Sequence, residues 1–218
     1  AFVNELALLF EKLGIDVYEV LEAAKTKYNF QIHYPGAGVG GPCLPVNSYQ
    51  ILNSARSVGM KNFKMVEAGR QINEKMPLHV VDLLLDAFKQ VRKDITNSKI
   101  LILGVTYKPD VKDIQLSPVE DIIKKLLELN VDVKIYDPYF KSEIVFNIKT
   151  ENDFVKAIHQ VDAIVLTTAH KEFHDLEPTF LAPRMKTPIV VDARGILDPD
   201  LSRKAGLIFR GLGRGKIQ

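Results

Sequence analysis

The stretch KILILGVTYKPDVKDIQLSPVEDIIKKLLELNVDVKIYDP, residues 99–138, decides the fold of this chain. It begins with a short apolar run of the kind that forms a buried strand. An amphipathic segment follows at residues 117–130, and a second strand pattern covers residues 131–138. A strand, a helix and a strand in this order form a right-handed crossover between parallel strands. The stretch therefore predicts one unit of a parallel sheet covered by helices.

The same alternation continues to the end of the chain, whereas the first 95 residues show only helical periodicity. In that first part, helices are expected near residues 2–13, 17–27, 45–58 and 62–92. Beyond residue 138 one helix and then three strands are expected, at residues 152–160, 162–169, 187–193 and 206–211. We therefore predict an α/β protein in two parts. An all-helical region, residues 1–95, is followed by a Rossmann-like domain with a mostly parallel sheet, residues 96–218.

Composition excludes several classes of partner. The 218 residues include 29 basic and 27 acidic side chains, and a formal net charge of +2 gives no general attraction to nucleic acid or to a membrane surface. No apolar run reaches the roughly 20 residues that a membrane span requires. The single cysteine, Cys43, excludes an internal disulfide framework and favours a reducing, cytoplasmic compartment. The chain opens at Ala1 without the features of a signal peptide, and we expect it to be part of a larger protein.

The densest chemistry lies in the loop YPGAGVGGPCLPVNSY, residues 34–49. Gly36, Gly38 and Gly41 formally match the dinucleotide fingerprint G-x-G-x-x-G. We reject that interpretation, because no predicted strand leads into the loop and no acidic residue follows at the required distance. Four glycines within six residues have a high entropic cost. That cost favours a close approach of the backbone to a ligand over a plain turn.

Cys43 lies near the end of this loop, beside the start of the predicted third helix, where Pro45 suits the first turn. The positive end of a helix dipole favours a thiolate, and a thiolate is a nucleophile. The alternative is a small buried thiol in the core, which is what most lone cysteines are. The residues alone leave both interpretations open.

Several motifs together carry a family resemblance. The chain contains, in this order, the motifs NELALLFEKLGID, PGAGVGGPCLPVNSY, GVTYKPDVKDIQLSP, YDPY and DARGIL. This set of motifs and its order resemble the UDP-glucose/GDP-mannose dehydrogenases. HYPGAGVGG and FRGLGRG look most like the branch that acts on UDP-N-acetylhexosamines, such as UDP-N-acetyl-D-mannosamine. The resemblance implies NAD-dependent oxidation of the C6 alcohol of a UDP-sugar to a uronic acid, through a cysteine thiohemiacetal and thioester. It also implies a homodimer formed through the long central helix. This chain would correspond to the central and UDP-sugar-binding domains, with the NAD-binding domain missing.

The resemblance assigns roles to individual residues. Cys43 corresponds to the catalytic nucleophile, and Asn47 stands where the family usually has an aspartate that helps to activate water. The residues expected to bind the UDP-sugar are Tyr34, Gly36, Gly38, Gly40 and Lys108. Arg194 is expected to bind the cofactor. Asn47 can orient water but cannot accept its proton, and Gln115 replaces an arginine of the family pattern.

Two alternatives to this function stay open: a UDP-glucose 6-dehydrogenase, and a non-catalytic module for nucleotide-sugar binding or dimerisation. The departures at Asn47 and Gln115 favour the second. We expect no metal site, because His170 and His174 are four residues apart but have no third ligand nearby in the sequence. The glycines and arginines of residues 210–215 predict a flexible basic terminus.

Overall fold

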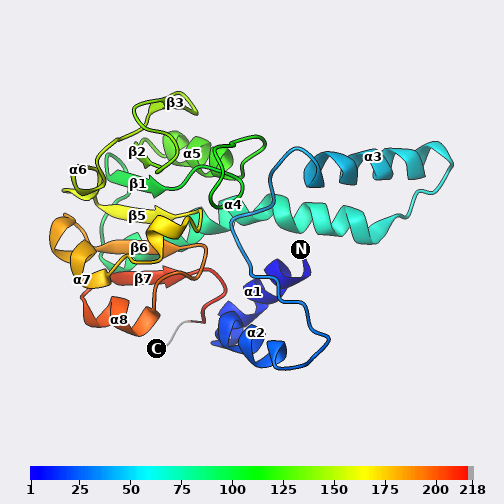
Figure 1. Cartoon of the computed structure of the whole chain (residues 1–218), viewed down its shortest axis with the longest axis horizontal. Helices are drawn as coiled ribbons and strands as arrows, with labels where there is room; N and C mark the ends of the chain where they lie inside the picture. The colour runs from blue at the N-terminus through cyan, green and yellow to red at the C-terminus, as the bar shows by residue number, and fades with distance from the viewer. Residues whose placement is uncertain (216–218) are drawn as a thin grey trace.

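The second half of the chain is built on a five-stranded parallel sheet, shown in Figure 1. The computed structural model describes residues 1–215. The strands are β1 (Lys99–Leu103), β2 (Asp132–Tyr136), β5 (Ala163–Leu166), β6 (Ile189–Asp192) and β7 (Ile208–Gly211). Their spatial order is β2-β1-β5-β6-β7, so the chain builds outward from β1 first to one side and then to the other. The predicted Rossmann-like parallel sheet is confirmed. The switch of direction lies between β1 and β5, where open α/β sheets collect ligands at the carboxyl ends of the strands.

Helices cover both faces of this sheet because successive strand residues point to opposite sides. On one face, Ile100 and Ile102 of β1 pack in a cluster with α4 (Lys64–Gln90) and α5 (Val119–Glu128). On the other face, Leu101 and Leu103 pack with the shorter α6 (Phe154–Ile158) and α7 (Pro178–Leu181). Strands buried on both faces explain the continuous apolar runs of the sequence.

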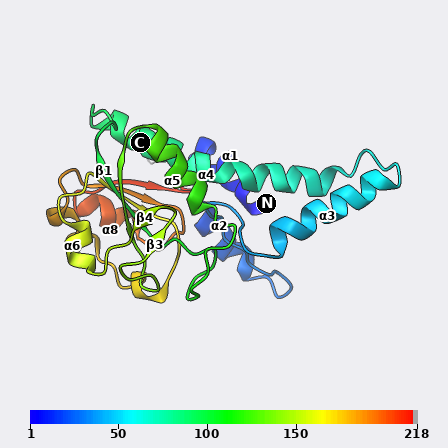
Figure 2. The same ribbon diagram turned by 90° about the horizontal axis from the view of Figure 1, so that it is seen from above.

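The first half is entirely helical, as predicted. Its helices are α1 (Phe2–Leu13), α2 (Val17–Lys25), α3 (Leu44–Ser57) and the 27-residue α4. Figures 1 and 2 show that α3 and the first part of α4 form a hairpin that projects away from the sheet. The second part of α4 lies against β6 and β7. The division near residue 95 stays a prediction, and one helix contributes to both of the parts that it separates.

The sequence patterns did not predict several short elements. They are β3 (Ile144–Val145), β4 (Ile148–Lys149), α8 (Pro199–Lys204) and the 3₁₀ turns η1 (Lys171–Phe173) and η2 (Ala182–Arg184), besides α7. None of the helices in residues 1–215 combines the length and the apolar character that crossing a bilayer requires.

The prediction of a flexible terminus at residues 210–215 is wrong. The Gly213 amide donates to the Glu11 carboxylate at 2.6 Å, and the Gly215 amide donates to the Ile15 carbonyl at 3.0 Å. Arg214 pairs with Asp16 at 2.6 Å. The glycines permit close contact, because a Cβ on Gly213 would lie 2.4 Å from a Val17 methyl group. Residues 211–215 are therefore a strap that fastens the last strand to α1 and α2.

Candidate functional site

Two asparagines hold the glycine loop against the helices. The Gly36 amide donates to Asn4 Oδ1 at 3.0 Å, and Asn4 Nδ2 donates to Asn73 Oδ1 at 2.9 Å. Asn4 is buried in α1, and Asn73 lies in α4. Periodicity could not reveal this link, because the partners are 32 and 69 residues apart in the sequence. These hydrogen bonds therefore fix the glycine loop between α1 and α4.

Protein atoms make the close approaches that the glycines permit. A Cβ on Gly36 would lie 2.2 Å from Arg194 Nη1, and a Cβ on Gly40 would lie 2.4 Å from the Leu116 carbonyl oxygen. Gly38 lies in the same loop against Pro118. The absence of side chains thus lets the loop pack closely against the α/β half. Contacts of these glycines with a sugar stay a prediction.

Arg194 is held by a buried acid at the end of β6. Asp192 is completely buried, and its carboxylate accepts the backbone N–H groups of Arg194, Gly195 and Leu197, each at 2.8 Å. Burial raises the pKa of Asp192, and the three N–H groups oppose that effect. The Asp192 carboxylate therefore stabilises the turn after β6, and this turn directs Arg194 toward the glycine loop.

A cavity of about 560 Å³ opens where Arg194 meets the loop. The predicted site residues Tyr34, Gly36, Gly38 and Arg194 line it together with apolar side chains of the first two helices. Arg194 Nε is buried and lacks a hydrogen-bond partner within residues 1–215. The cavity thus combines an apolar wall with a guanidinium cation.

Tyr18 lies beside Arg194 and stacks on Tyr34, with ring centroids 5.9 Å apart. Burial raises the pKa of the Tyr18 phenol far above its usual range, and the Asp192 and Asp16 carboxylates add to that effect. Its hydroxyl finds no partner in the part of the chain that the structure describes. Tyr18 is therefore a neutral aromatic side chain that packs behind Tyr34 in the wall of the cavity.

Cys43 and Asn47 lie outside that cavity, at the start of α3. Cys43 is the N-cap residue of α3 and is exposed, which excludes the buried core thiol. The Asn47 amide donates to the Cys43 carbonyl at 2.8 Å as the first helical hydrogen bond, and its side chain is exposed. The predicted position of the thiol at a helix N-terminus is confirmed.

The segment that carries Lys108 lies against the cysteine loop. The Gly41 amide donates to the Gln115 carbonyl at 2.9 Å, and a Cβ on Gly41 would lie 2.7 Å from the Tyr107 ring. Lys108 follows Tyr107 at the carboxyl end of β1 and is exposed. The structure thus brings the surroundings of Cys43 and Lys108 together, while Tyr34 and Arg194 line the separate cavity described above.

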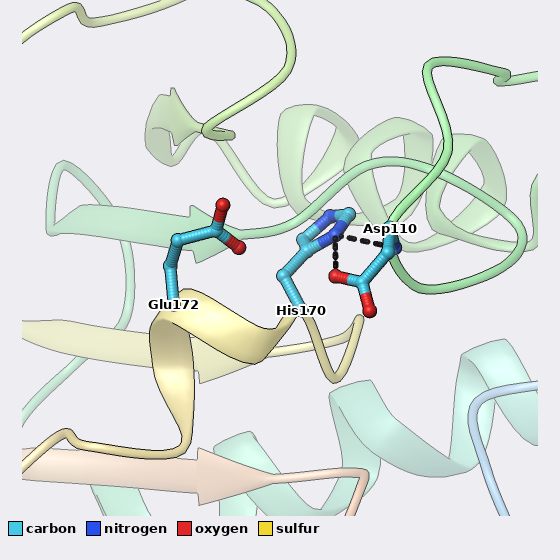
Figure 3. Close-up of side chains that lie close together, drawn as sticks. All are labelled: Asp110, His170 and Glu172. Carbon is cyan, nitrogen blue, oxygen red and sulfur yellow. Dashed lines mark hydrogen bonds and ion pairs between the residues drawn. The ribbon is translucent and has the colours of Figure 1, made fainter.

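A histidine with two carboxylates forms a further cluster at this edge of the sheet. Asp110, His170 and Glu172 offer potential ligand atoms within 4.8 Å of one another. Figure 3 shows Asp110 on one side of the His170 ring and Glu172 on the other. His170 Nδ1 accepts the Asp110 amide at 3.0 Å, and Nε2 lies 3.1 Å from Asp137 Oδ2. Both ring nitrogens are therefore already used, and the geometry favours a structural network over a metal centre.

His174 does not share this environment. It is exposed at the end of η1, whereas His170 is completely buried. The two histidines, although four residues apart in the sequence, therefore do not face a common site. Asp137 also has a structural task, because its carboxylate accepts the Val105 and Tyr139 amides, each at 2.8 Å.

Comparison with known proteins agrees with this architecture. Residues 1–75 match the central domain of the UDP-glucose/GDP-mannose dehydrogenase family, and residues 101–199 match its UDP-binding domain. The chain is 34% identical to a UDP-N-acetyl-D-mannosamine dehydrogenase of Pyrococcus horikoshii, over 100% of this chain and 49% of the relative. It is 33% identical to a UDP-N-acetyl-D-glucosamine 6-dehydrogenase of Pseudomonas aeruginosa, over 93% of this chain and 48% of the relative.

A solved structure of the UDP-D-ManNAc dehydrogenase from Pyrococcus horikoshii superposes with a TM-score of 0.86 at 34% identity. That superposition covers 98% of this chain and 48% of the solved chain. The chain thus spans about half the length of the curated relatives it matches. Its two matched regions cover both the helical part and the sheet, and they follow the family order. The chain therefore belongs to the UDP-glucose/GDP-mannose dehydrogenase family.

Proposed function

We propose that this chain forms the central and UDP-sugar-binding part of an enzyme that oxidises UDP-N-acetyl-D-mannosamine to its uronic acid in two NAD-dependent steps. The observation that carries the proposal is the exposed Cys43 thiol at the N-terminus of α3, next to the segment that bears Lys108. The names of several similar proteins support this choice of sugar. The composition is consistent with the proposed cytoplasmic location.

In this proposal the chemistry at C6 passes through Cys43. The first oxidation removes a hydride from C6 and the hydroxyl proton, which leaves an aldehyde. The Cys43 thiolate adds to the aldehyde carbon to form a thiohemiacetal, and loss of a second hydride gives a thioester. Water then attacks the thioester carbonyl, and cleavage of the C–S bond releases the carboxylate and the thiol. Backbone N–H groups near the helix N-terminus are suited to stabilising the oxyanions.

NAD, when bound, would supply the acceptor for both hydrides. Within this chain the residue that suits a contact with it is Arg194, because its Nε is buried without a partner in the described residues and it lines a cavity of about 560 Å³. A guanidinium group binds phosphate or ribose oxygens well. The loop after β1 offers no glycine fingerprint, so the main NAD site is expected outside this chain.

On the substrate side, Lys108 binds the diphosphate and the glycine loop binds the sugar. Lys108 is exposed at the carboxyl end of β1, beside the topological switch. Tyr34 and the backbone of Gly36, Gly38 and Gly40 supply the remaining predicted contacts. Asn47, one helical turn after Cys43, is suited to orienting water but needs another group to take the proton.

Alkylation of the thiol tests this proposal directly, because Cys43 is the only cysteine in the chain. Cys43 is expected to react with iodoacetamide faster than free cysteine at neutral pH, and saturating UDP-N-acetyl-D-mannosamine should protect it. UDP-glucose at the same concentration serves as the comparison for substrate choice. Reaction at the rate of free cysteine, with no protection by either nucleotide sugar, would contradict the proposed role.

A complementary test uses the protein that contains this chain. The Cys43→Ala variant should form no uronic acid while it still binds UDP-N-acetyl-D-mannosamine. The matched variant Ser48→Ala lies on the same helix, in its first turns. It should retain uronic acid formation, because the Ser48 hydroxyl donates to the Leu44 carbonyl within the same helix. Normal acid formation by Cys43→Ala would exclude the thioester route.

A non-catalytic nucleotide-sugar-binding module is the second candidate, and the amide at Asn47 favours it. Such a module would bind the nucleotide sugar with Cys43 no more reactive than free cysteine. A UDP-glucose 6-dehydrogenase would be distinguished by preferential protection with UDP-glucose in the same experiment.

We also propose a homodimer through the long central helix α4, at the end where it forms a hairpin with α3. Apolar side chains are exposed on this hairpin, with Met65 90% and Val58 81% accessible. Exposed apolar groups gathered on one element are typical of interaction surfaces. Sedimentation should show a dimer that Met65→Glu weakens. The control Ile144→Glu, a substitution at a residue 76% exposed on β3, should leave it intact. A monomeric wild-type chain would contradict the dimer.

A further inference from the structure

The loop after β1 is fastened on both sides of Lys108. The Thr106 hydroxyl donates to the Lys108 carbonyl at 2.8 Å, and the Asp110 amide donates to His170 Nδ1 at 3.0 Å. The Asp110 carboxylate in turn accepts the Lys171 amide at 3.0 Å. Within residues 1–215, no hydrogen bond or ion pair engages the Lys108 ammonium group. The backbone under Lys108 is thus fixed while its cation is available.

His170 is the centre of these contacts. It is completely buried, and Nε2 lies 3.1 Å from Asp137 Oδ2 and 3.2 Å from Thr106 Oγ1. Because Nδ1 accepts the Asp110 amide, the ring hydrogen lies on Nε2 and points at these two oxygens. Asp137 also accepts the Val105 amide at 2.8 Å. The ring therefore connects the ends of β1, β2 and β5 at one point.

The network satisfies groups that lie on both sides of the lysine. Thr106 comes two residues before Lys108 and Asp110 two residues after it. Asp110 has a φ of 60°, a left-handed conformation that a non-glycine residue holds only with local support. The His170 ring supplies that support through the Asp110 amide. Removing the ring would free the loop to change shape directly beneath Lys108.

We propose that His170 is a positioning residue, which holds the 105–110 loop so that the Lys108 ammonium group meets the diphosphate of the nucleotide sugar. This inference rests on the proposed function, because it takes Lys108 as the diphosphate contact. Its physical basis is preorganisation: a loop already held in its binding shape loses less entropy when the ligand binds. The ring itself touches neither substrate nor cofactor, so it acts only through the lysine.

The test is a double-mutant cycle on the 218-residue chain, with affinity for UDP-N-acetyl-D-mannosamine measured by calorimetry. Lys108→Ala should weaken binding. His170→Leu should weaken binding by about three- to tenfold, which lies within the range of coupling between residues of one network. In the Lys108→Ala background the His170→Leu change should have almost no further effect. The control His174→Leu alters an exposed histidine and should bind like the wild-type chain.

Two further variants separate positioning from general stability. His170→Asn keeps an acceptor near the Nδ1 position for the Asp110 amide, so it should recover part of the affinity that His170→Leu loses. Thr106→Val keeps the shape of the side chain but removes both the donor to the Lys108 carbonyl and the oxygen that lies 3.2 Å from His170 Nε2. It should also weaken binding in a Lys108-dependent way, even if His170→Leu melts at a lower temperature or fails to fold.

Each remaining outcome has a definite meaning. Losses of affinity that persist fully in the Lys108→Ala background would overturn the inference, because they show a general structural role. Normal binding by the folded His170→Leu and Thr106→Val variants, with weakened binding by Lys108→Ala, would overturn the inference and leave the proposed function intact. If Lys108→Ala binds normally, or the wild-type chain does not bind, the proposed function fails and the inference fails with it.

Discussion

The strap at residues 211–215 makes a quantitative prediction through two glycines that share a backbone conformation but differ in surroundings. Gly213 has a φ of 75°, and an added Cβ would lie 2.4 Å from Val17 Cγ1 and 3.0 Å from Ala7 Cβ. Both neighbours are completely buried. Gly206 has a φ of 87°, and nothing lies within 4 Å of its Cβ position. Alanine at either position meets the left-handed backbone, but only Gly213→Ala also meets a packed core.

The two free energies of unfolding should therefore differ. Gly206→Ala should lose about 1–2 kcal/mol, the cost of a left-handed conformation for an L-residue. Gly213→Ala should lose a further amount of about 1–3 kcal/mol from overpacking. Urea unfolding of the two variants and the wild-type chain measures the difference. Equal losses would refute the claim that the strap is packed against α1 and α2.

If the strap detaches in Gly213→Ala, the loss in the free energy of unfolding is limited. Hydrogen exchange then detects the detachment directly. The Val17 amide donates to the Gly213 carbonyl at 2.9 Å, and the Gly215 amide donates to Ile15. Both amides should exchange about 5- to 150-fold faster in Gly213→Ala, which corresponds to the same 1–3 kcal/mol. They should stay protected in Gly206→Ala. Unchanged exchange in both variants would contradict the docking.

Other parts of the fold give further expectations. Asn4→Ala leaves the buried Gly36 amide without its acceptor and should lower the free energy of unfolding by about 1–3 kcal/mol, whereas the exposed Asn53→Ala on α3 should lower it far less. Burial of Asp162 is outweighed by hydrogen bonds from Lys93, a backbone amide and a hydroxyl, so its pKa is lowered. A lowered pKa stabilises the fold above the unfolded value near 3.8, and the stabilisation is lost as the pH falls through the folded value. The difference in the free energy of unfolding between wild type and Asp162→Asn, measured with urea, should therefore be largest near pH 7. It should disappear below the pKa of Asp162 in the folded chain. A difference that is constant with pH would contradict the assignment.

The sequence was sufficient for the elements whose residues repeat with a regular period. β1, α5 and β2 follow from one stretch, because a strand buried on both faces and an amphipathic helix have distinct patterns. The end of α1 was also predictable, since Gly14 adopts the left-handed cap with a φ of 73°. Two-residue strands such as β3 and β4 are too short to show any period.

The candidate site was only partly predictable, for a different physical reason. The loop and its exposed cysteine stand out by composition. The contacts that fix them join residues far apart in the sequence, such as Asn4 with Asn73, and Asp110 with His170. No local pattern encodes such pairs. The glycines of the terminus predict mobility, but in the structure the missing side chain of Gly213 makes room for Val17 and Ala7.

The strap also has a consequence for the order of events during synthesis. Glu11 bonds to an amide 202 positions later, so α1 leaves the ribosome long before its partner exists. The helices α1 and α2 therefore stay incompletely covered until residues 211–215 have emerged. Arrested nascent chains of increasing length should show protease resistance of α1 only after residue 215 has cleared the tunnel.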